Sequence, residues 1–147
     1  MGDAAHAIVP FYGQGMNASF EDVLVLDQVM DREDNWSDIL SAYQVERKAD
    51  ADAIADLAVD NFYEMRDHTA NPVFVLKRQI ELHLEENYPS YYSKYSMVTF
   101  REEMPYHKAM QLGRKQDRVL MEVAASVNSK DEVNYESLLK DLKELAN

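Results

Sequence analysis

The sequence predicts a mainly helical protein, and two features of the chain support this. Apolar residues recur at the spacing of amphipathic helices through most of the sequence beyond residue 17. Glycine is nearly absent from that stretch, because three of the four glycines, Gly2, Gly13 and Gly15, lie before it. No internal repeat or linker divides the chain. We therefore expect a glycine-containing loop region followed by a series of helices.

The first two expected helices follow this loop region directly. A capping residue, Asn17 or Ser19, is expected to start the first helix, which runs to about Asp31. The second helical stretch begins near Ser37 and keeps its apolar period toward His68. It is expected to be one long helix or two helices in tandem.

The third helix has the clearest start signal in the chain. Asn71 is the expected cap, and Pro72 occupies the first helical position, where its missing N–H costs nothing. Pro89 closes this helix. Its expected buried stripe consists of Val73, Leu76, Ile80 and Leu84.

The remaining segments alternate between irregular and helical patterns. We expect residues 88–95 to be irregular and residues 97–100 to form a short extended piece. A helix should run from Pro105 to about Ser126. Ser129 or Asp131 is expected to cap a last helix with one apolar face. That face carries Tyr135, Leu138, Leu139, Leu142 and Leu145.

Composition excludes several classes of function. The net charge of −12 repels phosphate backbones and anionic lipid head groups, so neither nucleic acid nor a membrane surface is an expected partner. The absence of cysteine excludes disulfides and thiolate metal sites and favours a reducing cytoplasm. No apolar run approaches the roughly 18 residues of a membrane span. The four histidines show no metal-ligand spacing, so no metal site is expected.

The first residues suggest that the chain is a fragment of a longer protein. A Gly-Asp pair such as Gly2-Asp3 normally follows a strand, and Met1 stands where that strand should be. We therefore expect a missing N-terminal half, with Met1 arising from cloning or a misplaced start. The alternative is a complete small helical protein.

The residue types near the beginning suit a nucleotide-like cofactor with a planar ring. An ionised Asp3 is acceptor-only, which matches the two donors of a diol. Gly13 and Gly15 allow a close approach of the backbone to a planar group. The helix that follows presents its positive end and unpaired N–H groups to this loop.

Taken together, these residues carry a family resemblance. Gly-Asp-Ala-Ala-His-Ala at residues 2–7, Pro-Phe-Tyr-Gly-Gln-Gly-Met-Asn at residues 10–17, and Glu21-Asp22 resemble the second flavin-binding signature of class A flavoprotein monooxygenases. The resemblance implies an α/β FAD-binding aromatic hydroxylase fold, of which this chain is the helical C-terminal part. Residues 1–17 would end the FAD-binding region, and residues 18–147 would form the helical C-terminal region. The implied FAD contacts are Asp3, Pro10, Gly13, Gln14, Gly15, Met16 and Asn17.

Downstream motifs are similar to those of kynurenine 3-monooxygenases. They are Ala-Asp-Leu-Ala at residues 55–58, Asn-Phe-Tyr-Glu-Met-Arg at 61–66, Tyr-Ser-Met-Val-Thr-Phe at 95–100 and Tyr-His at 106–107. The resemblance implies that Asn61 and Tyr95 hold the amino-acid end of L-kynurenine. It also implies NADPH as co-substrate and 3-hydroxykynurenine as product. No residue of this chain is expected to be catalytic in the sense of a general base or nucleophile.

Two further expectations follow from the same resemblance. The family's dinucleotide-binding motif and its carboxylate-pairing arginine are absent here, so the chain alone is expected to be inactive. A fragment cut from a flavin domain should also expose an apolar face and tend to self-associate. Two alternatives stay open: a hydroxylase of the same class acting on another aromatic acid, and a non-enzymatic helical interaction module.

Overall fold

A computed structural model describes residues 1–68, 70–101 and 103–145, excluding the side chains of residues 67 and 68. Helices account for most of these residues, and no strand occurs among them, so the prediction of a mainly helical chain is confirmed. The chain divides into two compact units, Met1–Phe62 and Tyr63–Asn147. No helix of the described residues is long and apolar enough to cross a bilayer.

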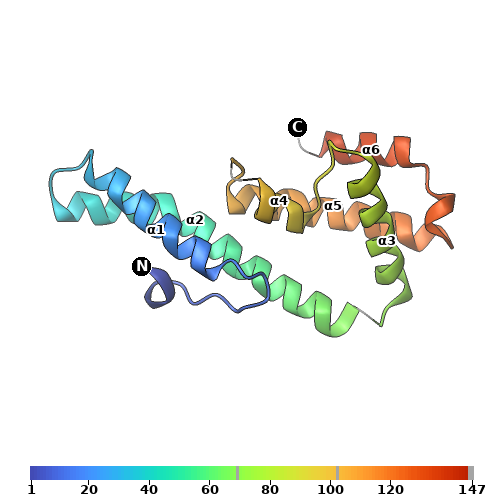
Figure 1. Ribbon diagram of the computed structural model, residues 1–147, viewed down its shortest axis with the longest axis horizontal. Helices are drawn as coiled ribbons and strands as arrows, with labels where there is room; N and C mark the ends of the chain where they lie inside the picture. The colour runs from blue at the N-terminus through green and yellow to red at the C-terminus, as the bar shows by residue number, and fades with distance from the viewer. Residues whose placement is uncertain (69, 102, 146–147) are drawn as a thin grey trace. The chain divides into compact units, whose positions relative to one another are not determined.

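The first unit is built on an antiparallel pair of helices (Figure 1). A short 3-10 turn, η1 (Gly2–Ala4), and a loop precede α1 (Gly15–Met30), which is followed by α2 (Trp36–Tyr63). The start expected for the first helix was wrong. Gln14 is the N-cap of α1 and makes no side-chain capping bond, while Ser19 donates to the carbonyl of Gly15 inside the first turns. The turn at the glycine loop already directs the chain into a helix, so no later cap is needed.

The expected second helical stretch is a single α-helix, because α2 continues without a break to Tyr63. A π-helical turn, η2 (Glu64–His68), follows it at the beginning of the second unit. The buried side chains of α2 fall on one stripe. They are Ile39, Arg47, Ala51, Ala53, Ile54, Leu57 and Ala58.

The second unit contains α3 (Pro72–Asn87), α4 (Lys94–Phe100), α5 (Tyr106–Ser126) and α6 (Tyr135–Glu144), with a 3-10 turn, η3 (Lys130–Glu132), before the last helix. Both α3 and α4 pack against α5. The expected cap at Asn71 is confirmed, since its side chain accepts from the N–H of Val73. The apolar core combines α3, α5 and α6 with one tyrosine. It consists of Ile80, Leu84, Tyr91, Leu120, Ala124, Leu138 and Leu142.

Two expectations for this unit were wrong. Residues 97–100 are helical in α4, although Val98, Thr99 and Phe100 have high β-propensity. The Ser93 side chain caps this helix by accepting from the N–H of Ser96, and burial of Met97 and Val98 outweighs the local preference. The last helix, likewise, is not capped by Ser129, which caps η3; Asn134 accepts from the N–H of Ser137 at the start of α6.

Candidate functional site

The glycine loop leaves open space beside its backbone. Gly13 has φ +72°, in the left-handed region that favours glycine, and a Cβ built there would meet no atom within 4 Å. Gly15 also has no atom within 4 Å of such a Cβ. Pro10, at the other end of the loop, is exposed. The backbone is therefore open at both glycines on the side where a Cβ would lie.

The N-terminus of α1 faces this loop with its positive end. The first N–H groups of any α-helix lack intrahelical acceptors, and here neither a capping side chain nor an acidic residue occupies the first turn. Asn17 donates through Nδ2 to Gln14 Oε1 at 2.7 Å, which tethers the two amides to each other. Gln14 is buried, whereas Met16 is 68% exposed. The helix end can thus accept a polar or anionic edge of a ligand.

Asp3 lies in η1, exposed, on a segment that is tied to α1. The backbone N–H of Gly2 donates to Asp22 Oδ2 at 2.8 Å. His6 Nε2 lies 2.7 Å from the same oxygen. The position of Asp3 therefore depends on the carboxylate of Asp22 in α1.

Asp22 is the centre of this arrangement and is fully buried. Besides Gly2 and His6, it accepts from Arg47 Nε of α2 at 2.9 Å. Burial by itself would raise the pKa of Asp22, but the hydrogen bonds from Gly2, Arg47 and His6 outweigh burial and lower this pKa below its usual value. The ionised carboxylate thus joins η1, α1 and α2.

Arg47 completes the connection between the two helices of the first unit. Its guanidinium donates to the carbonyl of Ala18 and to the carboxylate of Glu21, each at 3.1 Å. Five N–H donors in a fixed fork allow one arginine to satisfy several acceptors at once. The segment that carries Asp3 is therefore positioned by a buried ion pair between α1 and α2.

Sequence reasoning missed the role of this pair, although the sequence contains a signal for it. In the sequence, Asp22 was singled out as part of the Glu21-Asp22 pair of the flavin-binding signature and not as a partner of Arg47. It shares one helix face with Ala18 and Val29, which are buried. Arg47 likewise shares a face with Ala51 and other buried residues of α2. Opposite charges on two apolar stripes indicate an ion pair between the helices.

Asn61 lies next to the loop, fifty residues away in sequence. It sits near the end of α2, and its Nδ2 donates to the backbone carbonyl of Phe11. The rings of Phe11 and Phe62 also pack together, with centroids 4.8 Å apart. One predicted substrate residue therefore contacts the loop predicted to bind the flavin.

Tyr95 lies in the second unit, on α4, and is 48% exposed. Asn61 and Tyr95 therefore belong to different units of the chain. The described residues also contain no group of three or more His, Asp or Glu side chains arranged to hold a metal ion.

Comparisons with known proteins agree with the resemblance inferred from the motifs. Residues 1–58 match a sequence family described as FAD binding domain. A kynurenine 3-monooxygenase of Cytophaga hutchinsonii is 47% identical over 128 residues, which are 85% of this chain and 28% of that protein. The enzyme of the same name from Myxococcus xanthus is 43% identical over 91% of this chain and 29% of its own length.

A eukaryotic protein shows the same similarity. The kynurenine 3-monooxygenase of Dictyostelium discoideum is 43% identical over 94% of this chain and 32% of its own length. The chain thus spans less than a third of the length of these relatives. The resemblance to kynurenine 3-monooxygenases is confirmed, and it extends over most of the chain.

Proposed function

We propose that this chain is a C-terminal part of an FAD-dependent monooxygenase that hydroxylates L-kynurenine to 3-hydroxykynurenine with NADPH and O2. The observation that carries the proposal is the segment of residues 10–17, which comprises the end of the loop and the first residues of α1. It combines open space beside Gly13 and Gly15 with an uncapped helix N-terminus. It also lies inside the match to an FAD-binding family and to relatives named for this reaction.

The residues of the first unit fit FAD. The exposed carboxylate of Asp3 suits the ribityl or ribose hydroxyls, because it can accept from two donors. The open backbone at Gly13 and Gly15 suits the face or edge of the isoalloxazine ring. The N–H groups at the start of α1, near Met16 and Asn17, suit the pyrimidine edge, where reduced flavin carries negative charge. Pro10 and Gln14 complete the proposed set by shaping the loop.

When bound and reduced by NADPH, FAD would supply the activation of O2, from which one oxygen atom enters the kynurenine ring and the other leaves as water. The protein's part is to orient the substrate and exclude water. One N–H of Asn61 holds the Phe11 carbonyl, so the second N–H and Oδ1 of the same amide are the groups proposed to contact kynurenine. Tyr95 would donate its phenol O–H to the substrate carboxylate. No general base is required, because the aniline nitrogen of kynurenine already activates its ring.

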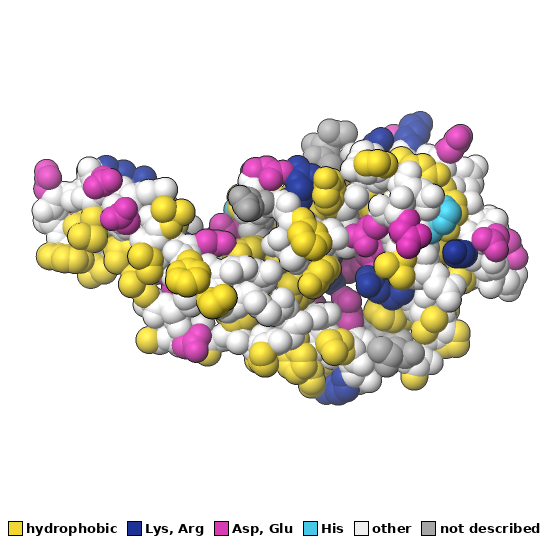
Figure 2. Space-filling view, in the orientation of Figure 1, with side chains coloured by type: hydrophobic (Ala, Val, Ile, Leu, Met, Phe, Trp, Pro, Cys, Tyr) yellow, Lys and Arg dark blue, Asp and Glu magenta, His cyan; other side chains and the backbone are white. Residues whose placement is uncertain are grey.

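The rest of the enzyme is the proposed partner of this chain. Many large apolar side chains of the first unit are exposed, and Figure 2 shows several of them gathered over the α1–α2 region. The set on α1 and the first residue of α2 is Met16, Phe20, Val23, Leu24, Met30 and Trp36. Such a surface supports packing against the remaining two thirds of a polypeptide of the relatives' length. The chain alone is expected to be inactive and to self-associate, and its lack of cysteine supports a reducing cytoplasm.

Two other functions make different predictions. A hydroxylase for another aromatic acid would bind FAD equally well but act on analogues that lack the amino-acid tail of kynurenine. A helical interaction module would bind no flavin and would be a stable monomer. The similarity to relatives named kynurenine 3-monooxygenase favours kynurenine among these alternatives.

The proposal is tested first by FAD content. The protein encoded by the complete reading frame should purify yellow, with about one FAD per chain. Asp3→Ala should weaken FAD binding by roughly tenfold or more, because it removes a charged hydrogen-bond acceptor from the ribityl or ribose hydroxyls. Asp27→Ala, an exposed aspartate of α1, is the matched control and should retain FAD. A colourless unaltered protein, or equal FAD content in the two variants, would contradict the FAD assignment.

A further inference from the structure

The helix that carries Tyr95 is too short to hold its own position. The seven residues of α4 are below the length at which an isolated helix is stable in water. The side chain of Tyr95 is about half exposed, so burial does not fix it. Contacts of the neighbouring residues therefore matter for the position of the Tyr95 backbone.

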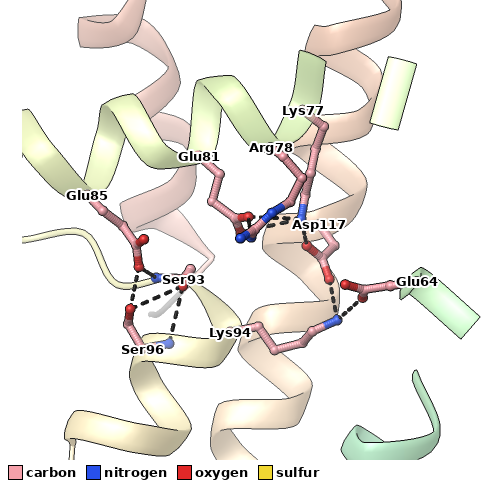
Figure 3. Close-up of polar contacts among 9 residues, drawn as sticks. All are labelled: Glu64, Lys77, Arg78, Glu81, Glu85, Ser93, Lys94, Ser96 and Asp117. Atoms are coloured by element: carbon pink, nitrogen blue, oxygen red, sulfur yellow. Dashed lines mark hydrogen bonds and ion pairs between the residues drawn. The ribbon is translucent and has the colours of Figure 1, made fainter. Parts of the chain in front are cut away.

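The first anchor of α4 is Glu85 of α3 (Figure 3). Its Oε1 accepts from the backbone N–H of Ser93 at 3.2 Å and from the hydroxyl of Ser96. Burial alone would raise the pKa of Glu85, but the hydrogen bonds from Ser93 and Ser96 outweigh burial and lower it. An ionised Glu85 thus holds the N-cap residue and the first turn of α4 against α3.

The second anchor is Lys94, which immediately precedes Tyr95. Its ammonium donates to Asp117 Oδ2 of α5 at 2.7 Å and to Glu64 of η2 (Figure 3). The Lys94 side chain is only 8% exposed, so these charged contacts are shielded from water. Burial lowers the pKa of Lys94, but Asp117 and Glu64 outweigh burial and raise it.

The path of the Lys94 side chain is fixed by a glycine. A Cβ built on Gly113 of α5 would lie 2.6 Å from Lys94 Cγ and 2.7 Å from Lys94 Cβ. Gly113 has no need of an unusual backbone conformation, since it lies within α5 and only Gly2 and Gly13 among the glycines have positive φ. Its lack of a side chain therefore serves to let the Lys94 stem cross α5 and reach Asp117.

We propose that Lys94 and Glu85 are positioning residues for Tyr95, and that they fix the backbone position from which the substrate-holding phenol extends. The two anchors act on residues 93, 94 and 96, on both sides of Tyr95. The backbone of Tyr95 is thereby fixed while its side chain stays accessible to a ligand. The inference rests on the proposed role of Tyr95 in binding kynurenine, and it adds residues that do not touch the substrate.

A double-variant experiment on the full-length enzyme separates positioning from general stability. Tyr95→Phe and Lys94→Met should each raise KM for kynurenine about tenfold, as expected for a lost charged hydrogen bond, with kcat and FAD content much less affected. If Lys94 acts through Tyr95, the double variant should be no worse than the worse single variant. Lys115→Met, at an exposed lysine of α5, is the control and should leave KM unchanged. Effects on KM that multiply in the double variant would overturn the inference.

A second measurement requires no enzymatic activity. In protein labelled with 3-fluorotyrosine, the fluorine signal of Tyr95 is identified by its loss in Tyr95→Phe. Lys94→Met and Glu85→Ala should shift or broaden this signal, whereas Glu86→Ala, at the exposed neighbour of Glu85, should not. A Tyr95 signal unchanged in both anchor variants would overturn the inference. Failure of the unaltered enzyme to bind kynurenine would instead contradict the proposed function, and the fluorine result would still decide whether the anchors fix Tyr95.

Discussion

Replacing Asp117 by Asn is expected to destabilise the Tyr63–Asn147 unit by roughly 3 kcal/mol, the lower end of the cost of breaking a buried ion pair. Asp117 accepts from Lys77 at 2.5 Å and from Lys94 at 2.7 Å. The side chains of these lysines are only 3% and 8% exposed, so neither ammonium can turn to water when the carboxylate is lost. Glu81 would remain as a partner of Lys77, and Glu64 as a partner of Lys94.

Hydrogen exchange of the α5 amides, followed by mass spectrometry, measures this effect within the second unit. Glu122→Gln removes one negative charge from an exposed position of the same helix and serves as the control. It should change the free energy of opening by less than about 0.5 kcal/mol. Equal protection of the α5 amides from exchange in Asp117→Asn and Glu122→Gln would show that the Asp117 carboxylate contributes nothing to the stability of this unit.

Replacing Arg47 by Met is expected to destabilise the Met1–Phe62 unit by roughly 3 kcal/mol. The change leaves the fully buried Asp22 carboxylate without its guanidinium partner, while Gly2 and His6 still contact it. These remaining contacts place the cost at the lower end of the range for buried pairs. Hydrogen exchange of the α1 and α2 amides measures the change, and Lys48→Met, at the exposed neighbour of Arg47, is the control.

The loss of stability caused by Arg47→Met should become smaller as the pH falls. The folded pKa of Asp22 lies below its ordinary value of 3.8, so this carboxylate contributes stability above that value. The contribution is lost as the pH falls through the folded pKa, where the carboxyl becomes neutral. The difference in the free energy of unfolding between the unaltered chain and Arg47→Met should therefore be largest near pH 7 and should decrease below about pH 4. A difference that stays constant down to pH 2 would contradict the assignment of the effect to the Asp22 charge.

Local sequence signals predicted the parts of the fold that depend on local interactions. Asn71 and Pro72 start a helix because the cap and the fixed proline φ act within one turn. The segment 97–100 was mispredicted because its preference for extended structure is weaker than its tertiary contacts. Burial of Met97 and Val98 and the contact of Ser96 with Glu85 involve residues from other helices, which the local sequence does not reveal.

In the candidate site, too, features built from neighbouring residues were predicted, and contacts between distant residues were not. The spacing of Gly13, Gly15 and the following helix predicted the loop, since all its parts are adjacent in sequence. The contact between Asn61 and Phe11 spans fifty residues, and only the family resemblance drew attention to Asn61. The ion pairs of Asp22, which is buried, and of Asp117, which pairs with two buried lysines, were not recognised, because their partners are distant in sequence.

Kynurenine-dependent oxidation of NADPH, with identification of the product, tests the central proposal most directly. The protein encoded by the complete reading frame should form 3-hydroxykynurenine, and Asn61→Ala or Tyr95→Phe should abolish or strongly reduce its formation at low kynurenine concentration. A yellow protein whose NADPH oxidation is unaffected by kynurenine would contradict the proposed substrate while leaving the flavin site in place. A protein that contains no FAD and forms no product would contradict both.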